Sequence, residues 1–89
     1  MADDRFNKLK EQLELQEWPA VYFFKFIMPN DDEKVAKVTA MFDEGSDLNF
    51  QPSRTGKYIS VSIKELMLGV DQIIKRYDDA SKIEGVIAL

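Results

Sequence analysis

The side chains that most often carry out chemistry in proteins are largely missing from this sequence. It contains no histidine and no cysteine, which removes the usual general base near neutral pH, the commonest metal ligand, thiol catalysis and disulfides. Ser60 and Ser62 therefore have no histidine to activate them, and activation by lysine would need a buried lysine that the pattern does not indicate. We expect a protein that is not an enzyme and needs no cofactor.

Acidic residues gather in two groups, Asp31-Asp32-Glu33 and Asp43-Glu44 with Asp47. A calcium-binding loop needs alternating oxygen ligands, a central glycine and a distal glutamate, and neither group has that spacing. The first group suits the first turn of a helix, where the helix dipole favours anions. We therefore expect no metal site.

The segment "FQPSRTGKYISVSIKE", residues 50–65, is the most basic part of a chain whose net charge is −4. Arg54 and Lys57 flank a Gly56 turn and, together with Tyr58, form a candidate anion site. The alternative is a solvated hairpin tip whose charges discourage edge-to-edge pairing. Both interpretations stay open at this point.

Length and composition indicate one small globular domain of 89 residues. The polar start "MADDRFNKLK" does not resemble a signal peptide, and no apolar run approaches the roughly 20 residues that span a bilayer. The acidic balance disfavours nucleic acid and anionic membranes as partners. We expect a cytoplasmic protein with a single domain over residues 1–89, in which residues 1–17 are an appended N-terminal helix.

Apolar spacing and breaker residues predict the order of the elements. The first strand is rich in aromatic residues and is expected to be buried on both faces or nearly so, with Lys25 marking the side that reaches water. The predicted elements are a helix over Asp3–Leu15, a strand over Ala20–Met28, a helix from an Asn30 N-cap to Gly45, strands over Leu48–Arg54 and Lys57–Lys64, a helix over about Leu66–Ala80, and a strand over Lys82–Leu89.

After the first helix, this order is β-α-β-β-α-β, which predicts an α+β, ferredoxin-like sandwich. Two right-handed crossovers place both later helices on one face of a four-stranded antiparallel sheet with strand order 4-1-3-2. Pro52 lacks an amide hydrogen, which fits the edge position that this order gives to its strand.

Strand alternation predicts which side chains face away from the helices. If Ile59, Val61 and Ile63 lie beneath the helices, the opposite face is uncovered, and its contiguous apolar group should be covered by something. Three covers are open: the N-terminal helix, a second copy of the chain, or another protein. The predicted uncovered surface consists of Phe23, Lys25, Ile27, Tyr58, Ser60, Ser62 and Val86, with Ala88 beside them.

Two stretches, "EWPAVYFFKFI" and "QPSRTGKYISVSI", resemble the signature segments of the YbeD-like family, and the similarity extends over residues 13–89. These are small bacterial proteins of unknown function, one of which carries the label lipoate-regulatory protein. The resemblance implies a ferredoxin-like fold similar to the ACT regulatory domain, and it implies no reaction. The chain departs from the amino-acid-binding ACT domains at Met28-Pro29-Asn30, where those domains have a glycine-containing turn.

We therefore expect a non-catalytic binding or regulatory domain that acts through its open sheet face and basic hairpin on a protein partner or on a second copy. One alternative is an ACT-like sensor of a small anionic metabolite at Arg54, Lys57 and Tyr58. Another is binding of single-stranded RNA by stacking on Phe23 and Tyr58, which the acidic net charge disfavours.

Overall fold

The computed structural model describes residues 6–43 and 46–89. Asp3, Asp4 and Gly45, which we expected at helix ends, lie outside these residues. Within them, no helix has both the length and the apolar character needed to cross a bilayer. The elements are α1 (Asn7–Glu14), β1 (Ala20–Pro29), α2 (Asp32–Thr39), β2 (Asp47–Pro52), β3 (Tyr58–Met67), α3 (Val70–Ser81) and β4 (Ile87–Ala88).

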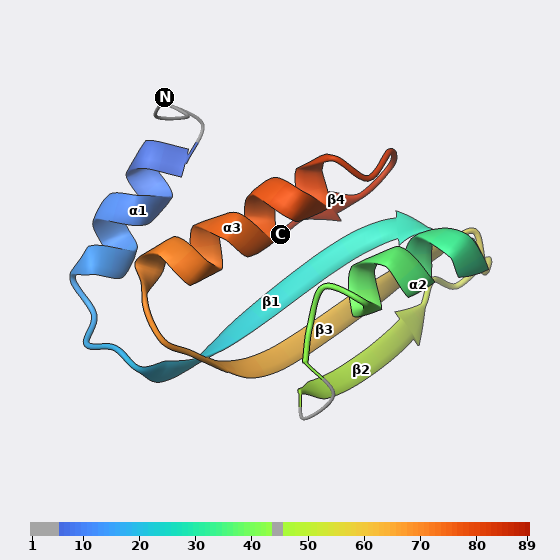
Figure 1. Ribbon diagram of the computed structural model, residues 1–89. Helices are drawn as coiled ribbons and strands as arrows, with labels where there is room; N and C mark the ends of the chain where they lie inside the picture. Colours follow the sequence, from blue (N-terminus) through green and yellow to red (C-terminus); the bar gives the residue numbers. More distant parts are fainter. Residues whose placement is uncertain (1–5, 44–45) are drawn as a thin grey trace.

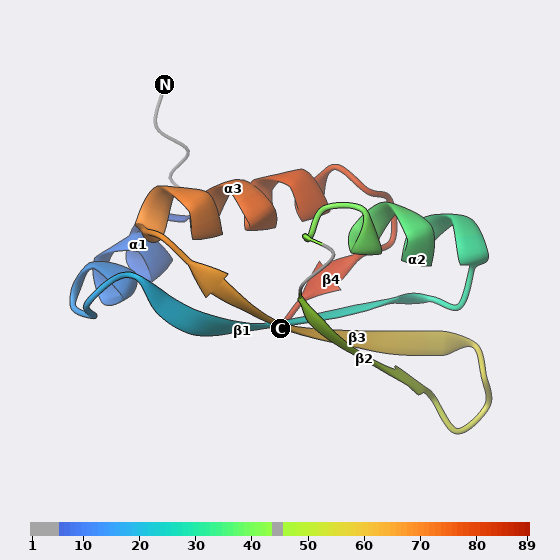
Figure 2. The same ribbon diagram turned by 60° about the horizontal axis from the view of Figure 1, so that its bottom comes forward.

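The strands form one antiparallel sheet in the order β2-β3-β1-β4, as predicted. β1 and β3 are the long central pair, and Pro52 lies on the edge strand β2, where no ladder hydrogen bond is needed from its nitrogen. α2 and α3 cover one face of the sheet (Figures 1 and 2). This is the predicted α+β, ferredoxin-like sandwich.

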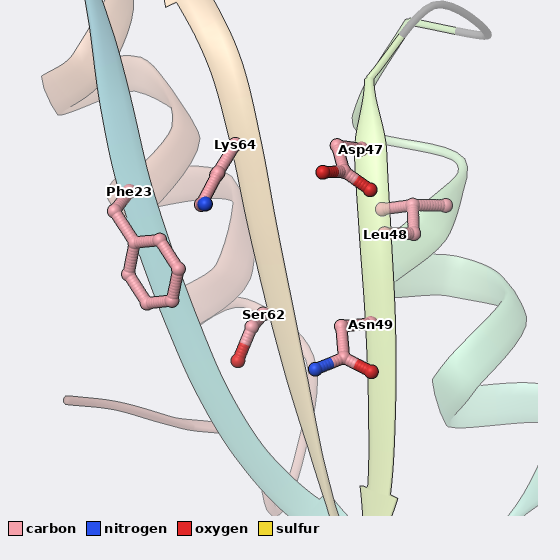
Figure 3. A pocket seen from close by; sticks show the side chains of 6 residues that line it. All are labelled: Phe23, Asp47, Leu48, Asn49, Ser62 and Lys64. Carbon is pink, nitrogen blue, oxygen red and sulfur yellow. The ribbon is translucent and has the colours of Figure 1, made fainter.

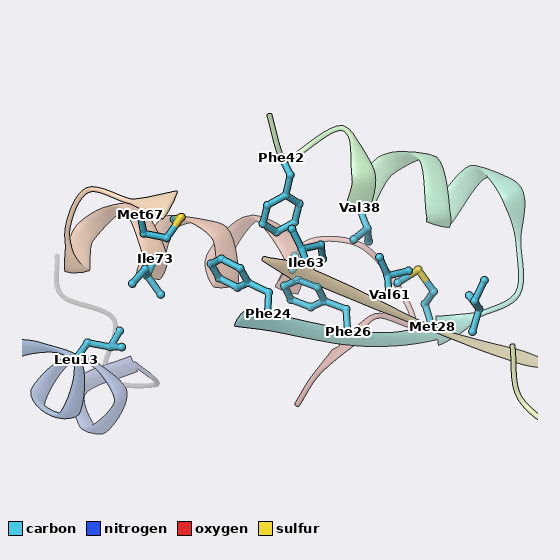
Figure 4. Close-up of a cluster of buried hydrophobic side chains, with 12 residues drawn as sticks. Leu13, Phe24, Phe26, Met28, Val38, Phe42, Val61, Ile63, Met67 and Ile73 are labelled. Atoms are coloured by element: carbon cyan, nitrogen blue, oxygen red, sulfur yellow. The ribbon is translucent and has the colours of Figure 1, made fainter. Parts of the chain in front are cut away.

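The core lies between the two helices and the central strands (Figure 4). Ile59, Val61 and Ile63 point into it, which confirms the predicted parity of β3. β1 contributes every second residue, from Phe24 to Met28. The expectation that β1 is buried on both faces is wrong, because the sheet has helices on one side only and Phe23 remains half exposed.

α1 docks beside α3 and leaves the far face of the sheet uncovered (Figure 2). Leu13 of α1 is 2% exposed and belongs to the core cluster. The indole N–H of Trp18 donates a 2.9 Å hydrogen bond to the Leu13 carbonyl, which fixes the chain after the helix. Of the three possible covers for the open sheet face, the N-terminal helix is therefore ruled out over the described residues.

α2 begins one residue later than predicted. Its N-cap is Asp31, whose carboxylate accepts a 2.8 Å hydrogen bond from the Glu33 amide. Asn30 instead prolongs the pairing between β1 and β3, since its amide donates to the Lys57 carbonyl and its side chain to the Gly56 carbonyl. The first turn of α2 is thereby tied to the tip of the β2–β3 hairpin.

β3 is longer than predicted, and α3 starts later. Leu66, which we expected on the inner face of the last helix, lies near the end of β3 opposite Val21. The alternation of β3 continues through Lys64 to the buried Met67. Gly69 is the N-cap of α3 and has an extended backbone conformation, so the helix begins at Val70.

Candidate functional site

The candidate site is the sheet surface that faces away from α2 and α3, here called the open face. Of the predicted surface residues, Phe23, Lys25 and Ile27 point to this face from β1, and Tyr58, Ser60 and Ser62 do so from β3. The pairing register joins the two sets, because Lys25 lies opposite Ser62 and Ile27 opposite Ser60. The sequence pattern thus identified most of the surface.

Val86 is the exception, and its predicted place on the open face is wrong. It precedes β4, is half buried and packs against the core, while its amide donates to the Ile83 carbonyl in the turn after α3. In β4 it is Ile87 that lies opposite Ile27 on the open face. Ala88 lies opposite the buried Phe26 and so faces the helical side, contrary to prediction.

Large apolar side chains gather at both ends of the open face. Val21, Phe23 and Leu66 form one group, here called the Phe23 cluster, in which Val21 and Leu66 are directly opposite each other. Ile27, Tyr58 and Ile87 form the other, here called the Ile27 cluster. Apart from Ile27, which is less exposed, these side chains are 52% to 67% exposed.

A polar strip separates the two clusters. It contains Lys25, Ser60 and Ser62 from the central strands and, at the edge, Asn49 and Gln51 of β2, which lie opposite the two serines. Because successive residues of a strand point to opposite faces, all of these share the open face. The surface is therefore apolar at both ends and polar in the middle.

The open face is hollowed next to the Phe23 cluster (Figure 3). Lys64 extends over Phe23, with its ammonium nitrogen 6.0 Å from the ring centroid. Asp47 lies opposite Lys64 in the register, but the two form no ion pair. The hollow has a volume of about 330 Å³ and is lined by Phe23, Asp47, Leu48, Asn49, Ser62 and Lys64.

A second hollow of about 460 Å³ continues from the first around the edge of the sheet and shares Asp47 and Lys64 with it. Its remaining lining residues are Val21, Asp43, Ser46, Glu65 and Leu66. Together the two hollows make the Phe23 end of the open face concave.

A buried ion pair on the helical side supports this end of the sheet. Glu65 follows Lys64 and points inward, where one carboxylate oxygen accepts a 2.8 Å hydrogen bond from the Arg76 guanidinium of α3. The other oxygen accepts a 2.9 Å hydrogen bond from the Ser46 hydroxyl. Arg76 also donates to the Met41 carbonyl and stacks over Phe42. These contacts attach α3 and the residues that follow α2 and precede β2 to β3.

Two tyrosines close the core near the start of β1. The hydroxyls of Tyr22 and Tyr77 are hydrogen-bonded at 2.9 Å. Burial, followed by this hydrogen bond, raises the pKa of the Tyr77 phenol well above its usual range. Neither hydroxyl lies on the open face, so we assign this pair a role in packing.

The open face lacks the arrangement that a nucleophilic hydroxyl requires. In the part of the chain that the structure describes, neither the Ser60 nor the Ser62 side chain is hydrogen-bonded to a base. The described residues of the chain also contain no group of three acidic side chains placed as metal ligands. The site therefore presents shape, apolar surface and charge.

The predicted anion site at Arg54, Lys57 and Tyr58 lies at the hairpin tip, and all three residues are exposed. Gly56 adopts the expected positive φ of 77°. Its amide donates to the Ser53 carbonyl, and the Tyr58 amide donates to the Ser53 hydroxyl. These two turn amides are engaged within the hairpin, so an anion here would rely on the side chains, and the site stays a prediction.

Fold and site together define a ferredoxin-like sandwich with one uncovered, partly apolar sheet face. The chain belongs to the family described as "Protein of unknown function (DUF493)", which matches residues 13–89. The matched region contains every strand, α2, α3 and the whole open face. No curated protein and no solved structure gave a significant match.

Proposed function

We propose that this protein is a non-catalytic binding domain whose open face docks onto another protein chain. The observation that supports it is the pair of exposed apolar clusters on one face, at Phe23 and at Ile27, which α1 leaves uncovered. Clusters of exposed apolar side chains mark interaction sites more often than isolated exposed residues do. The absence of histidine and cysteine from the chain supports a role without catalysis.

A regulatory role, the YbeD-like resemblance and a cytoplasmic location belong to the same proposal. Membership in the matched family is compatible with that resemblance and names no activity. In this proposal the domain regulates the protein to which it binds. The lipoate label of a YbeD-like protein favours no particular residue in this chain.

The register disfavours single-stranded RNA as the ligand. Phe23 lies opposite Lys64, whereas Tyr58 lies opposite Pro29 at the other end of β1. At roughly 3.3 Å per residue the two aromatic rings are about 20 Å apart along the strands, too far to stack on adjacent bases.

Crosslinking in cells tests the proposed function. We expect wild-type protein to be crosslinked to a partner chain, and Phe23→Ser to lose that crosslink because it removes the aromatic centre of one cluster. Leu15→Ser is the matched control, since Leu15 is 87% exposed and follows α1, which packs beside α3 and not on the open face. In both variants the free energy of unfolding should stay within about 1 kcal/mol of the wild-type value.

Loss of the crosslink in both variants, or in neither, would contradict a docking role for the open face. Retention in Leu15→Ser together with loss in Phe23→Ser would support it.

A further inference from the structure

The cations of this protein divide into two groups by layer. Most of those on or directly after the helices are ion-paired with nearby carboxylates, as in Lys37–Glu33, Lys75–Asp79, Lys82–Asp78 and the buried Arg76–Glu65. The exceptions among the described residues are Lys8 and Lys34, and Lys34 donates a hydrogen bond to the Glu84 carbonyl. The cations of the sheet and its hairpin, Lys25, Lys64, Arg54 and Lys57, form no ion pair in the part of the chain described by the structure. Of the described cations that form no ion pair, the larger share thus lies on or beside the open face.

Lys25 and Lys64 stand among the apolar side chains of this face. Lys64 extends over Phe23, and Lys25 follows Phe23 by two residues on the same face of β1, with Ile27 two residues further on. A partner that covered the clusters would also remove both ammonium groups from water. Burial of an unpaired charge is costly, so a stable partner must bring carboxylates to these positions.

A second copy of the chain fits this requirement poorly. A two-fold contact through the open face would place the same surface on both sides, so it would bring a second set of the same unpaired lysines into the interface. Among the described strand side chains, Asp47 is the one carboxylate on this face, and it lies at the edge, on β2. An excess of one sign of charge within such an interface opposes the association.

Resting on the proposed function above, we propose that the open face binds an acidic segment of a different protein. The carboxylates of that segment pair with Lys25 and Lys64, and its apolar side chains pack on the Phe23 and Ile27 clusters. One side chain of the segment enters the hollow beside Phe23, where Asn49 and Ser62 offer hydrogen bonds. The clusters are about 13 Å apart along β1, the length of about four extended residues.

Synthetic peptides of about twelve residues test the charge requirement and are long enough to reach both clusters. Three peptides share the same leucines and differ only in the residues between them, which are glutamate, glutamine or lysine. Titrated into isotope-labelled protein and followed by NMR, the glutamate peptide should shift the amide signals of Phe23, Lys25, Ser62 and Lys64. Its dissociation constant should be about tenfold below that of the glutamine peptide, because two partly desolvated ion pairs are gained.

The double variant Lys25→Gln with Lys64→Gln should bind the glutamate and glutamine peptides equally. The matched control is Lys8→Gln with Lys37→Gln, which changes the net charge by the same amount on the helical side and should keep the preference. A preference that survives in the first variant, or disappears in the control, would overturn the inference.

Other results would also overturn it: equal binding of all three peptides, binding of none, or signal changes confined to the helices. Concentration-dependent self-association that Phe23→Ser abolishes would replace the acidic partner with a second copy. Failure here is distinguishable from failure of the proposed function. A crosslinked partner that depends on Phe23 but not on the two lysines would leave the docking role intact and exclude the acidic segment.

Discussion

Glu65 is buried although its neighbours in sequence, Lys64 and Leu66, reach the open face. Its side chain is 7% exposed and that of Arg76 is 11% exposed. Each carboxylate oxygen and the guanidinium have partners, so the ion pair is retained at little net cost. Removal of one member leaves the other charged and without its partner in the interior.

Glu65→Ala should therefore lower the free energy of unfolding by about 3 kcal/mol, the lower end of the range for broken buried pairs, because some water reaches Arg76. Urea denaturation measures this value. Replacement of both partners, Glu65→Leu with Arg76→Met, should recover most of the loss, since no charge is then buried. A loss in the double variant that equals or exceeds that of Glu65→Ala would contradict this explanation.

Tyr77 gives a dependence of stability on pH whose sign follows from its environment. Burial raises the pKa of its phenol in the folded protein. The phenol ionises near pH 10 when the chain is unfolded. The folded state thus holds the proton more strongly, so this contribution to stability is complete below about pH 10 and is lost as the pH rises above it.

We expect Tyr77→Phe to weaken this alkaline loss of stability, as measured by urea denaturation between neutral and alkaline pH. At neutral pH the variant should lose about 1 kcal/mol, because the hydrogen bond to Tyr22 is removed. Identical pH profiles for the variant and the wild type would show that other groups cause the alkaline destabilisation.

At the scale of elements, α1 is a short helix that depends on docking for its stability, because isolated helices of this length are unstable in water. Leu13 is its buried contact. The N-terminal helix was a possible cover for the open face, but it packs beside α3 instead. Loss of this contact should thus affect the helices and leave the open face unchanged.

Leu13→Ala should cost about 2–3 kcal/mol of unfolding free energy, because it removes a fully packed leucine. Leu15→Ala on the same segment should cost less than about 0.5 kcal/mol. NMR signals of Lys25, Ser60 and Ser62 should be unaffected by either change. Large shifts of these three signals in Leu13→Ala would indicate that α1 contacts the open face after all.

The elements also show where sequence patterns are sufficient and where they fail. Polar and apolar residues alternate strictly from Tyr58 to Lys64, so both faces of β3 could be assigned. The alternation is absent from "VIAL" at residues 86–89, where no polar residue marks a face, and the prediction for Val86 was one residue out of register. Leu66-Met67-Leu68 is equally uninformative, which explains why Leu66 was expected in a helix.

No local sequence pattern predicts the contacts between elements that are distant along the chain. The pairing of Glu65 with Arg76 requires β3 to lie beneath α3, and the hollow between Phe23 and Asp47 requires the register of three strands. Neither follows from spacing along the chain. Val21 did carry a signal, since it shares the parity of Phe23 and could have been added to the surface from the sequence.

At the scale of the whole molecule, the two layers differ in charge. Acids outnumber cations on the helices and their connecting loops, whereas the sheet and hairpin contribute Lys25, Arg54, Lys57 and Lys64 against Asp47 and Glu65. The net charge of −4 conceals this division. A prediction of partners from the net charge alone therefore reflects the acidic helical side and does not reflect the excess of cations on the sheet and hairpin.

This division of charge makes the sheet side of the molecule more positive than the helical side. In the field of a negatively charged body, the protein turns its sheet forward before any contact is made, and the approach of the helical side is repelled. Compared with the same net charge spread evenly, this arrangement would favour approach by the sheet side, and dissolved ions would weaken the effect by screening the field. The uneven placement of ordinary surface charges thus favours one side of this small domain in its approach to a negatively charged body.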